Sequence, residues 1–400
     1  QGMAGKAMIV YAMGITQHTT GTDNVKSCAN LAMLTGHVGK PSTGVNPLRG
    51  QNNVQGACDM GALPNVFSGY QPVTDAAARK KFEEAWSVTG LDDKPGLTIG
   101  AMMDAALKGD VKALYVMGEN PMMSDPDTSH IEQALSSLDF LVVQDIFLSE
   151  TAVMADVVLP AASFAEREGT YTNTERRVQI SRQAVSPPGS AWPDWKIIRE
   201  VSRLSGYPMN CDSADDIMKE INRLTPSYAG IVYPRLESSH GLQWPCPNED
   251  HPGTAYLHRD RFSKGKGTFL PCDFRPLAEP PDEEYNFLLT TGRIHFHYHT
   301  GTMTRRISLL EREAPETRIE IHPDDAKPLG IRSNDMIEIT SRRGSAKARA
   351  EVTECVPPRV LFSTFHFHEA QINRLTNPAS DPTAKIPEYK GCAVKVRRCA

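Results

Sequence analysis

One segment of the sequence surrounds a single arginine with glycines and side-chain amides. Residues 44–56 read GVNPLRGQNNVQG, and Arg49 stands directly before Gly50 and Gln51. A polar stretch with few apolar anchors is costly to order unless a polar partner fills the space that it surrounds. The guanidinium offers a planar fork of donors that suits a small carboxylate. A solvated arginine on a surface loop is the alternative, and this segment alone does not separate the two interpretations.

A Met-Gly pair closes an apolar run at two places, residues 13–14 and residues 117–118, and polar residues follow each pair. Free backbone N–H groups ahead of a helix N-terminus favour phosphate, because the amides and the helix dipole both attract an anion. A plain turn is the alternative. Because the strand, Met-Gly and polar sequence recurs about a hundred residues later, it suggests two similar nucleotide-sized sites on one α/β body.

Histidines alternate at positions 295, 297 and 299, shortly after Arg293, and His366 and His368 repeat this spacing. On a strand, alternating residues share one face about 6.5–7 Å apart, which is awkward for one metal ion. Three interpretations stay open for both groups: a metal site formed by protein alone, ordinary strand histidines, or hydrogen bonds to a bound ligand.

The segment 166–177 is densely polar and carries charges of both signs. Its residues include Glu166, Arg167, Glu168, Asn173, Glu175, Arg176 and Arg177. Mixed charges at this density usually form a solvated or mutually paired surface. The sequence has no Ser/His/Asp nucleophile signature, Walker loop or GxGxxG motif. Hydrolase and nicotinamide-dehydrogenase functions therefore lack support.

Strands and helices must position these residues. Apolar runs predict strands over residues 7–13, 111–118, 140–145 and 156–160. Helical spacing predicts helices from Asp23 or Asn24 to Gly36, over residues 131–138, and after a cap at Asp194. Residues 163–192 are polar and loop-rich, residues 207–283 form a long irregular segment, and the alternation after residue 284 predicts an all-β module.

Composition limits the remaining classes of function. The 400 residues allow two to four domains, and the 43 Lys+Arg against 48 Asp+Glu argue against a general nucleic-acid binder. No window approaches the ~18 consecutive apolar residues of a membrane helix. The eight cysteines include no CxxC pair, so we expect reduced thiols and a cytoplasmic location. The opening QGMAGKAMIVYAMG runs straight into a strand pattern and is typical of a chain cut from a longer one.

Several longer motifs together resemble one family. The segment from MGITQHTTGTDN to LRGQNNVQGACDMGALP, then VMGENP, VVQDIF, ADVVLPAASFAEREGTYTNTERRVQ, INRLTNP and PEYKGCAVKV, is similar to the catalytic subunit of molybdenum- or tungsten-dependent formate dehydrogenases. The resemblance runs in order along essentially the whole chain. It implies oxidation of formate to CO2, or the reverse, at a metal held by two molybdopterin guanine dinucleotides.

The resemblance also assigns residues. Arg49 is similar to the arginine that holds the formate carboxylate. The implied contacts of the first dinucleotide side are Met13, Gly14, Gln17 and Gln51. Those of the second unit are Gly118, Asn120, Ser124, Gln144, Asp145 and Asp194. The implied pterin and phosphate contacts of the C-terminal module are Arg293, His297, Asn373, Tyr389 and Lys390. Asn120 and Phe365 stand where some relatives carry Asp and Tyr. No residue of this sequence is assigned to the metal.

The implied architecture is two related nucleotide-binding α/β units, an irregular α+β segment and a C-terminal six-stranded double-psi β-barrel. We place the borders at residues 1–51, 52–162, 163–283 and 284–400. The family's [4Fe–4S] cysteines and metal-ligating Cys or selenocysteine lie upstream of the matching strand. We therefore expect an iron–sulfur subunit or a missing N-terminal portion to supply them. The alternatives are another bis-pterin oxidoreductase, such as nitrate reductase, and a non-catalytic cofactor-binding scaffold; arginine before Gly-Gln favours formate over nitrate.

Overall fold

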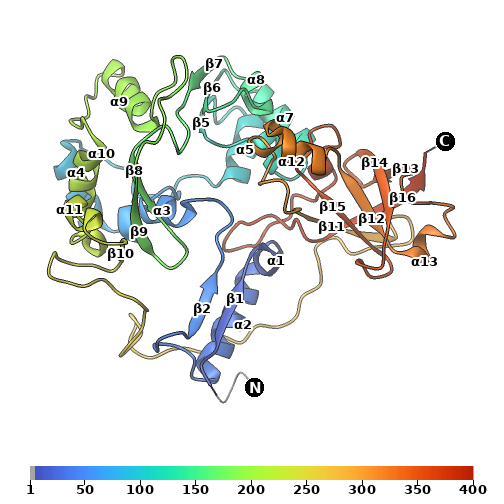
Figure 1. Ribbon diagram of the computed structural model, residues 1–400, viewed down its shortest axis with the longest axis horizontal. Coiled ribbons are helices and arrows are strands. Elements are labelled where there is room, and N and C mark those ends of the chain that lie inside the picture. Colours follow the sequence, from blue (N-terminus) through green and yellow to red (C-terminus); the bar gives the residue numbers. More distant parts are fainter. Residues whose placement is uncertain (1–4, 400) are drawn as a thin grey trace. The chain divides into compact units, whose positions relative to one another are not determined.

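The structure is a computed structural model that describes residues 5–399 (Figure 1). The chain divides into two compact units, each made of three segments. The Arg49 unit contains the residues up to Ala12, Ser27–Ile99 and Pro160–Leu270. The barrel unit contains Met13–Lys26, Gly100–Leu159 and the residues from Pro271 onwards. The four domain borders expected from the sequence stay predictions.

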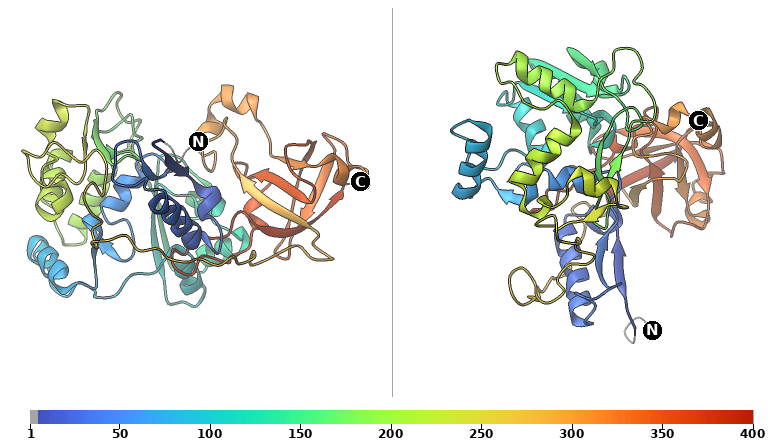
Figure 2. Two further views of the ribbon diagram at one scale, coloured as in Figure 1. Left: turned by 90° about the horizontal axis from the view of Figure 1, so that it is seen from below. Right: turned by 60° about the vertical axis from the view of Figure 1, so that its left-hand side comes forward.

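The C-terminal part of the barrel unit is a closed six-stranded barrel (Figure 2). Its strands, in barrel order, are β11 (Phe287–Gly292), β15 (Val360–Thr364), β12 (Arg318–Ile321), β14 (Ser345–Val352), β13 (Met336–Thr340) and β16 (Cys392–Arg398). The pairs β11–β15 and β12–β14 are parallel and the other four are antiparallel. The prediction of an all-β module that forms a six-stranded barrel is confirmed at this level.

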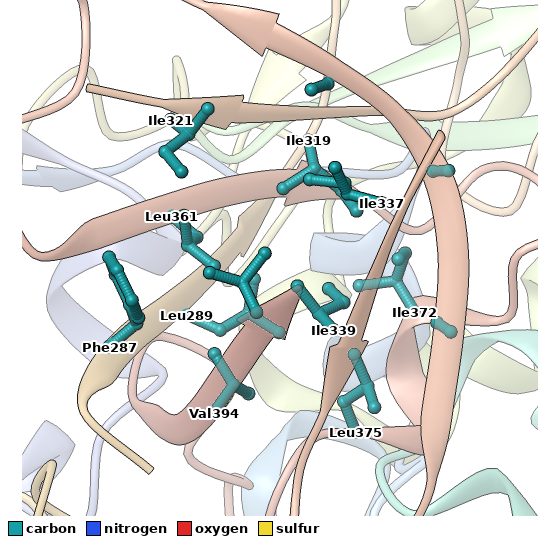
Figure 3. Close-up of a cluster of buried hydrophobic side chains, with 14 of the residues drawn as sticks. Phe287, Leu289, Ile319, Ile321, Ile337, Ile339, Leu361, Ile372, Leu375 and Val394 are labelled. Carbon is teal, nitrogen blue, oxygen red and sulfur yellow. The ribbon is translucent and has the colours of Figure 1, made fainter. Parts of the chain in front are cut away.

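The barrel strands alternate between inward and outward side chains. Along β14, the alanines at 346, 348 and 350 are buried and the residues between them are exposed, which is the two-residue period of a strand. The inward side chains form one apolar cluster around Leu289, Ile319 and Ile339 (Figure 3). Burying one such side chain contributes roughly 1.5–3 kcal/mol to folding.

The rest of the barrel unit is an α/β layer. Its sheet has the order β5 (Ala113–Met117), β6 (Phe140–Asp145), β7 (Val157–Pro160), and β5 and β6 are parallel. The helices α5 (Ile99–Leu107) and α7 (Thr128–Ser136) cover it through an apolar cluster that includes Met103 and Ile131. Short helices α6 (Pro121–Ser124) and α8 (Glu150–Val153) follow β5 and β6. The strands predicted over 111–118, 140–145 and 156–160 are confirmed.

In the Arg49 unit, β1 (Met8–Tyr11) pairs in parallel with β2 (Gly44–Pro47), and α3 (Val54–Asp59) follows the Arg49 segment. A second sheet has the order β10 (Leu242–Gln243), β9 (Arg177–Ser181), β8 (Gly169–Thr172). Its core joins these strands to α10 (Ala214–Leu224) and α11 (Tyr233–Glu237) through buried residues such as Tyr228.

The remaining helices and strands complete the described part of the chain. They are α1 (Met13–Thr16), α2 (Gly21–Leu34), β3 (Val66–Phe67), β4 (Gln71–Pro72), α4 (Ala76–Trp86), α9 (Asp194–Leu204), α12 (Ser308–Glu313), α13 (Pro323–Ala326) and the 3-10 turns Ser68–Tyr70, Pro226–Tyr228, Thr304–Arg306 and Ile372–Arg374. Over residues 5–399, the structure contains no helix with the length and apolarity needed to cross a membrane.

Three local predictions are wrong. The strand predicted over 7–13 is confirmed over Met8–Tyr11, but the turn expected at Met13-Gly14 is wrong: these residues begin α1, where the N–H of Gln17 donates to the Met13 carbonyl at 3.0 Å. Helix α2 starts at Gly21, before both expected caps. Asp194 is the first residue of α9 and Pro193 holds the cap position, while the Asp194 carboxylate pairs with Arg167 at 3.1 Å.

The strand interpretation of the alternating histidines at 295–299 is also wrong. Strand β11 ends at Gly292 and the following residues form turns. The buried ring of His297 explains the departure, because its Nε2 lies 2.7 Å from the Ala314 carbonyl and its Nδ1 lies 3.2 Å from the Thr304 hydroxyl. These contacts hold the chain in turns that an extended strand would not form.

Candidate functional site

The edge of the α/β sheet in the barrel unit carries several of the predicted cofactor residues. Gly118 follows β5 with a φ of 61°, a conformation that suits glycine, and its N–H donates to the Gln144 carbonyl at 2.9 Å. Asn120 is buried; its Oδ1 accepts from the N–H and hydroxyl of Thr151, and its Nδ2 donates to Glu150 at 2.7 Å. The loop after β5 is therefore tied to α8, which fixes the position of Ser124 beyond it.

The end of β6 contributes two more predicted residues. Gln144 is fully buried, and its Oε1 accepts a hydrogen bond from the Tyr115 hydroxyl. The Asp145 carboxylate accepts from the N–H of Ile146 at 2.7 Å. Burial raises the pKa of Asp145 above its ordinary value, although hydrogen bonds from the backbone of Ile146 and Phe147 and from the Ser149 side chain oppose the rise. Both parallel strands thus end at the same edge of the sheet, as the prediction of a nucleotide-sized site requires.

Two residues from the end of the chain reach this edge. Asn373 donates through Nδ2 to the carbonyls of Met123 at 2.8 Å and Ser124 at 3.2 Å. Tyr389 donates from its hydroxyl to the same Ser124 carbonyl at 2.8 Å. The Oδ1 atom of Asn373 is buried and has no hydrogen-bond partner among the described residues of the barrel unit. An unsatisfied buried acceptor is costly, so this atom is suited to a ligand that donates a hydrogen bond.

Lys390 and Arg293 place two cations in the barrel unit. The ammonium of Lys390 donates to the Thr291 carbonyl, and burial followed by the nearby charge of Arg293 lowers the pKa of Lys390 to about 8. Arg293 is exposed as a residue, but partial burial of its guanidinium lowers its pKa, and the guanidinium lies 5.7 Å from the Phe365 ring centre. Among the described residues of the barrel unit, no carboxylate forms an ion pair with either cation. Two cations in that situation favour an anionic ligand.

His297 was predicted as a cofactor contact, but protein groups already contact both nitrogens of its ring. A carbonyl oxygen can only accept, so Nε2 donates to Ala314, and Nδ1 shares a hydrogen bond with the Thr304 hydroxyl. Both ring nitrogens are therefore engaged by the protein. Among the histidines, cysteines and carboxylates of residues 5–399, the structure has no group of three or more that could hold a metal ion.

The predicted residues near the start of the chain dock on the segment 381–390. The carbonyl of Gln17 accepts from the Lys390 N–H at 3.4 Å, and Thr22 donates from its N–H to Asp381 at 2.8 Å. The α1 helix carries Met13 and Gly14 into the same unit. The barrel unit thus contains thirteen of the sixteen predicted residues, the exceptions being Arg49, Gln51 and Asp194.

Arg49 lies half-buried in its own unit. Its N–H donates to the Thr174 hydroxyl at 3.4 Å, whereas its side-chain Nε is buried without a partner among the described residues of that unit. No carboxylate of this described part forms an ion pair with the guanidinium. Burial raises the pKa values of Tyr11 and Cys58, and the positive charge of Arg49 opposes both rises, which places the charge beside them.

The charged segment 166–177, predicted to be a solvated or mutually paired surface, forms one ion pair within itself and further pairs with residues outside it. Arg177 binds Glu175 at 2.8 Å, and Glu168 binds Arg182 at 2.7 Å. Arg176 differs: it donates to the Trp244 and Thr254 carbonyls and lies 5.5 Å from the Trp244 ring centre.

Sequence reasoning missed several residues that build the site. Glu150 and Thr151 hold Asn120. Asn53 directly precedes α3, and Asp59 is the last residue of that helix. Asn53 lies in the amide-rich stretch 44–56 and Asp59 lies three residues beyond it, but nothing in their spacing showed which partners they bind.

Residues 3–204 match the sequence pattern of the molybdopterin oxidoreductase family, and residues 287–393 match that of the molydopterin dinucleotide binding domain. The chain belongs to the molybdopterin oxidoreductase family. The second match coincides with the closed barrel, so the barrel of this family member is a dinucleotide-binding domain.

Relatives in this family include formate dehydrogenases. The chain is 57% identical over 401 residues to the F420-dependent formate dehydrogenase subunit alpha of Methanocaldococcus jannaschii, covering 99% of this chain and 59% of the relative. It is 39% identical to formate dehydrogenase H of Escherichia coli, covering 99% of this chain and 56% of the relative. The chain thus spans somewhat more than half the length of these relatives.

A solved structure shares the fold. Acetylene hydratase from Pelobacter acetylenicus superposes with a TM-score of 0.60 at 19% identity, over 82% of this chain and 50% of that one.

Proposed function

We propose that this chain is the cofactor- and substrate-binding part of a formate dehydrogenase catalytic subunit, which oxidises formate to CO2 or catalyses the reverse. The observation that carries the proposal is the half-buried guanidinium of Arg49, with its unpartnered Nε and no paired carboxylate in the described part of its unit. A cation in that setting favours a small anion. The identity of 57% to an F420-dependent formate dehydrogenase subunit supports formate as that anion.

The proposed cofactor is a pair of molybdopterin guanine dinucleotides that carry Mo or W, and the residues present fit such a group. Lys390 and Arg293 are cations suited to its phosphates, and the buried Oδ1 of Asn373 is suited to an N–H of its heterocycles. We infer that two related nucleotide-binding α/β units and a double-psi barrel hold the pair. When bound, the cofactor supplies the two-electron redox chemistry.

The role of Arg49 is to bind and orient the substrate. Formate yields CO2, one proton and two electrons, so the hydrogen on carbon must face the redox group. A fork of donors that binds both carboxylate oxygens leaves that C–H bond pointing away from the guanidinium. Because arginine stays protonated, Arg49 is not the acceptor of the proton. An iron–sulfur partner, in another subunit or in a further portion of the chain, would accept the electrons.

The test compares Arg49→Lys and Arg49→Ala in the complete enzyme that contains this chain, with formate and a viologen acceptor. We expect kcat/KM for formate to fall roughly a hundredfold or more in both variants while molybdenum, tungsten and pterin contents stay at wild-type levels. Lysine does not rescue because it lacks the planar fork. The matched control is Arg312→Lys, an exposed arginine paired with Glu313, which leaves kcat/KM unchanged.

Three outcomes would contradict the proposal. Wild-type formate turnover in Arg49→Ala would remove Arg49 from the site. Nitrate reduction by a complete enzyme that is inactive with formate would support the nitrate-reductase alternative. Full cofactor content without turnover of either substrate would indicate a non-catalytic scaffold.

A further inference from the structure

A buried carboxylate in the Arg49 unit is bound by four neutral donors. Asp59, the last residue of α3, is 1% exposed. Its Oδ1 accepts from Gln55 Nε2 at 2.8 Å and from the Tyr70 hydroxyl at 2.8 Å. Its Oδ2 accepts from the Tyr228 hydroxyl at 2.5 Å and from Trp244 Nε1 at 2.7 Å. No cation in the described part of the unit forms an ion pair with it, so these four hydrogen bonds, together with the nearby positive charge of Arg176, stabilise the carboxylate.

The proton count at Tyr228 extends this network. The tyrosine hydroxyl has one proton, and a carboxylate can only accept, so that proton goes to Asp59. The Thr172 hydroxyl, 3.2 Å from the Tyr228 oxygen, is therefore the donor in that second contact. Burial, followed by the negative charge of Asp59, raises the pKa of Tyr228, which agrees with a hydroxyl that keeps its proton.

Thr172 connects the network to the Arg49 segment. Its N–H donates to Asn53 Oδ1 at 2.8 Å. Asn53 has a left-handed backbone, with φ of 61° and ψ of 18°, and it directly precedes α3, which ends at Asp59. The bonds thus form a closed ring that runs from Asp59 through Tyr228, Thr172 and Asn53 and returns along α3. A side-chain bond at a left-handed residue fixes the point at which the chain enters the helix.

The β8–β9 pair, whose first strand ends at Thr172, also holds the other end of the Arg49 segment. Thr174, which lies just beyond β8, accepts from the N–H of Arg49 at 3.4 Å. The preceding residue, Leu48, donates from its N–H to the Tyr11 carbonyl at 2.7 Å. The segment 49–53 is therefore held at both ends, at Arg49 through Thr174 and at Asn53 through Thr172.

We propose that Asp59 is a positioning residue for Arg49. Its carboxylate fixes Tyr228 and α3, the ring of hydrogen bonds fixes Asn53, and the segment 49–53 is held in one conformation that presents the guanidinium to a small carboxylate. The last step rests on the proposed function, whereas the ordering of residues 49–53 does not. Asp59 does not touch the substrate and acts through Arg49.

The experiment uses two variants of the complete enzyme. Asp59→Asn keeps the shape but sets an NH2 group against two of the four donors. Asn53→Gly permits the left-handed backbone, which glycine adopts freely, and removes the acceptor for Thr172 together with the rest of the side chain. We expect amide hydrogen exchange of residues 49–53 to quicken about tenfold or more in both variants. We also expect KM for formate to rise roughly ten- to hundredfold, with a smaller fall in kcat.

A matched control distinguishes positioning from general destabilisation. Glu279 binds Arg343 in the barrel unit at 2.7 and 2.9 Å, so Glu279→Gln also breaks a carboxylate network. That variant is expected to keep wild-type exchange at residues 49–53 and a wild-type KM for formate. In an Arg49→Ala background, Asp59→Asn is expected to have no further effect on KM, because its effect passes through the guanidinium.

Several results would overturn the inference. Wild-type exchange at residues 49–53 in both variants would show that the ring does not order the segment. Faster exchange with an unchanged KM would leave Asp59 with a purely structural role. If Asp59→Asn fails to fold, Asn53→Gly decides alone. Normal formate turnover in Arg49→Ala would contradict the proposed function. That result would not affect the exchange measurement, which tests the ordering of residues 49–53 alone.

Discussion

The hydroxyl of Tyr389 lies 2.8 Å from the Ser124 carbonyl, although 265 positions separate the two residues. Asn373 donates to the same carbonyl at 3.2 Å. Because one oxygen accepts from both, the end of α6 is fixed against two segments that lie outside the barrel strands. This junction gathers Ser124, Asn373 and Tyr389, three residues that we propose as cofactor contacts.

Asn373→Asp tests this junction. The substitution replaces the donor toward the Met123 and Ser124 carbonyls with an acceptor, so we expect the free energy of unfolding to fall by about 2 kcal/mol. We also expect less pterin in the purified enzyme. Denaturant unfolding and cofactor analysis measure the two effects.

Asn222→Asp is the matched control, because Asn222 likewise donates through Nδ2 to two carbonyls, those of Tyr228 and Ile231. It should lose similar stability and keep its pterin. An equal loss of pterin in both variants would show that cofactor content merely follows stability.

Lys390→Met tests the anion site through pH. The folded pKa of Lys390 is about 8, below the ordinary 10.5. The unfolded chain therefore binds more protons between these values, and the stability of the cofactor-free protein should rise with pH across this window. The variant should lose that rise, as measured by thermal unfolding from pH 7 to 10.5.

Inorganic pyrophosphate gives a second measurement on the same variant. It should raise the melting temperature of the cofactor-free wild type at pH 7 more than at pH 9.5, where the ammonium is mostly neutral, and the effect should shrink in Lys390→Met. Lys395→Met is the control, because this exposed lysine pairs with Glu284 at 2.8 Å. A pyrophosphate response that Lys390→Met leaves intact would exclude Lys390 from the site.

His366→Gln tests a neutral histidine at 0% exposure. Its Nε2 accepts from the Ile294 N–H at 3.1 Å and its Nδ1 donates to the His299 carbonyl, so the ring carries one proton. Burial, the largest cause, lowers the pKa of His366 to about 4.

Stability should therefore decrease as pH falls from 6.5 towards 4, since the unfolded chain takes up the proton first. Denaturant unfolding at several pH values should show a shallower decrease in His366→Gln, whereas His295→Gln, on the exposed turn, should keep the wild-type slope. Identical slopes in all three proteins would mean that other groups dominate.

Much of the fold could be predicted from local patterns. The apolar runs marked β5, β6 and β7, and the alternation after residue 284 marked the barrel, because side chains within a strand follow a fixed two-residue period. The same reasoning failed at Asp194, whose position suits a cap. Pro193 holds the cap position instead, and the Asp194 carboxylate pairs with Arg167, which lies 27 positions earlier in the chain.

The candidate site divides in the same way. The sequence by itself determined the residue types, a guanidinium at position 49 among amides and an Asn, Tyr and Lys near the end of the chain. Only the tertiary structure decided that Asn373 binds carbonyls 249 and 250 positions away, that both nitrogens of His297 are engaged, and that Asp59 is connected to Asn53 through Thr172. The physical reason is that backbone geometry fixes how neighbours along a helix or strand are placed, whereas contacts between distant residues exist only once the strands have paired and the core has closed.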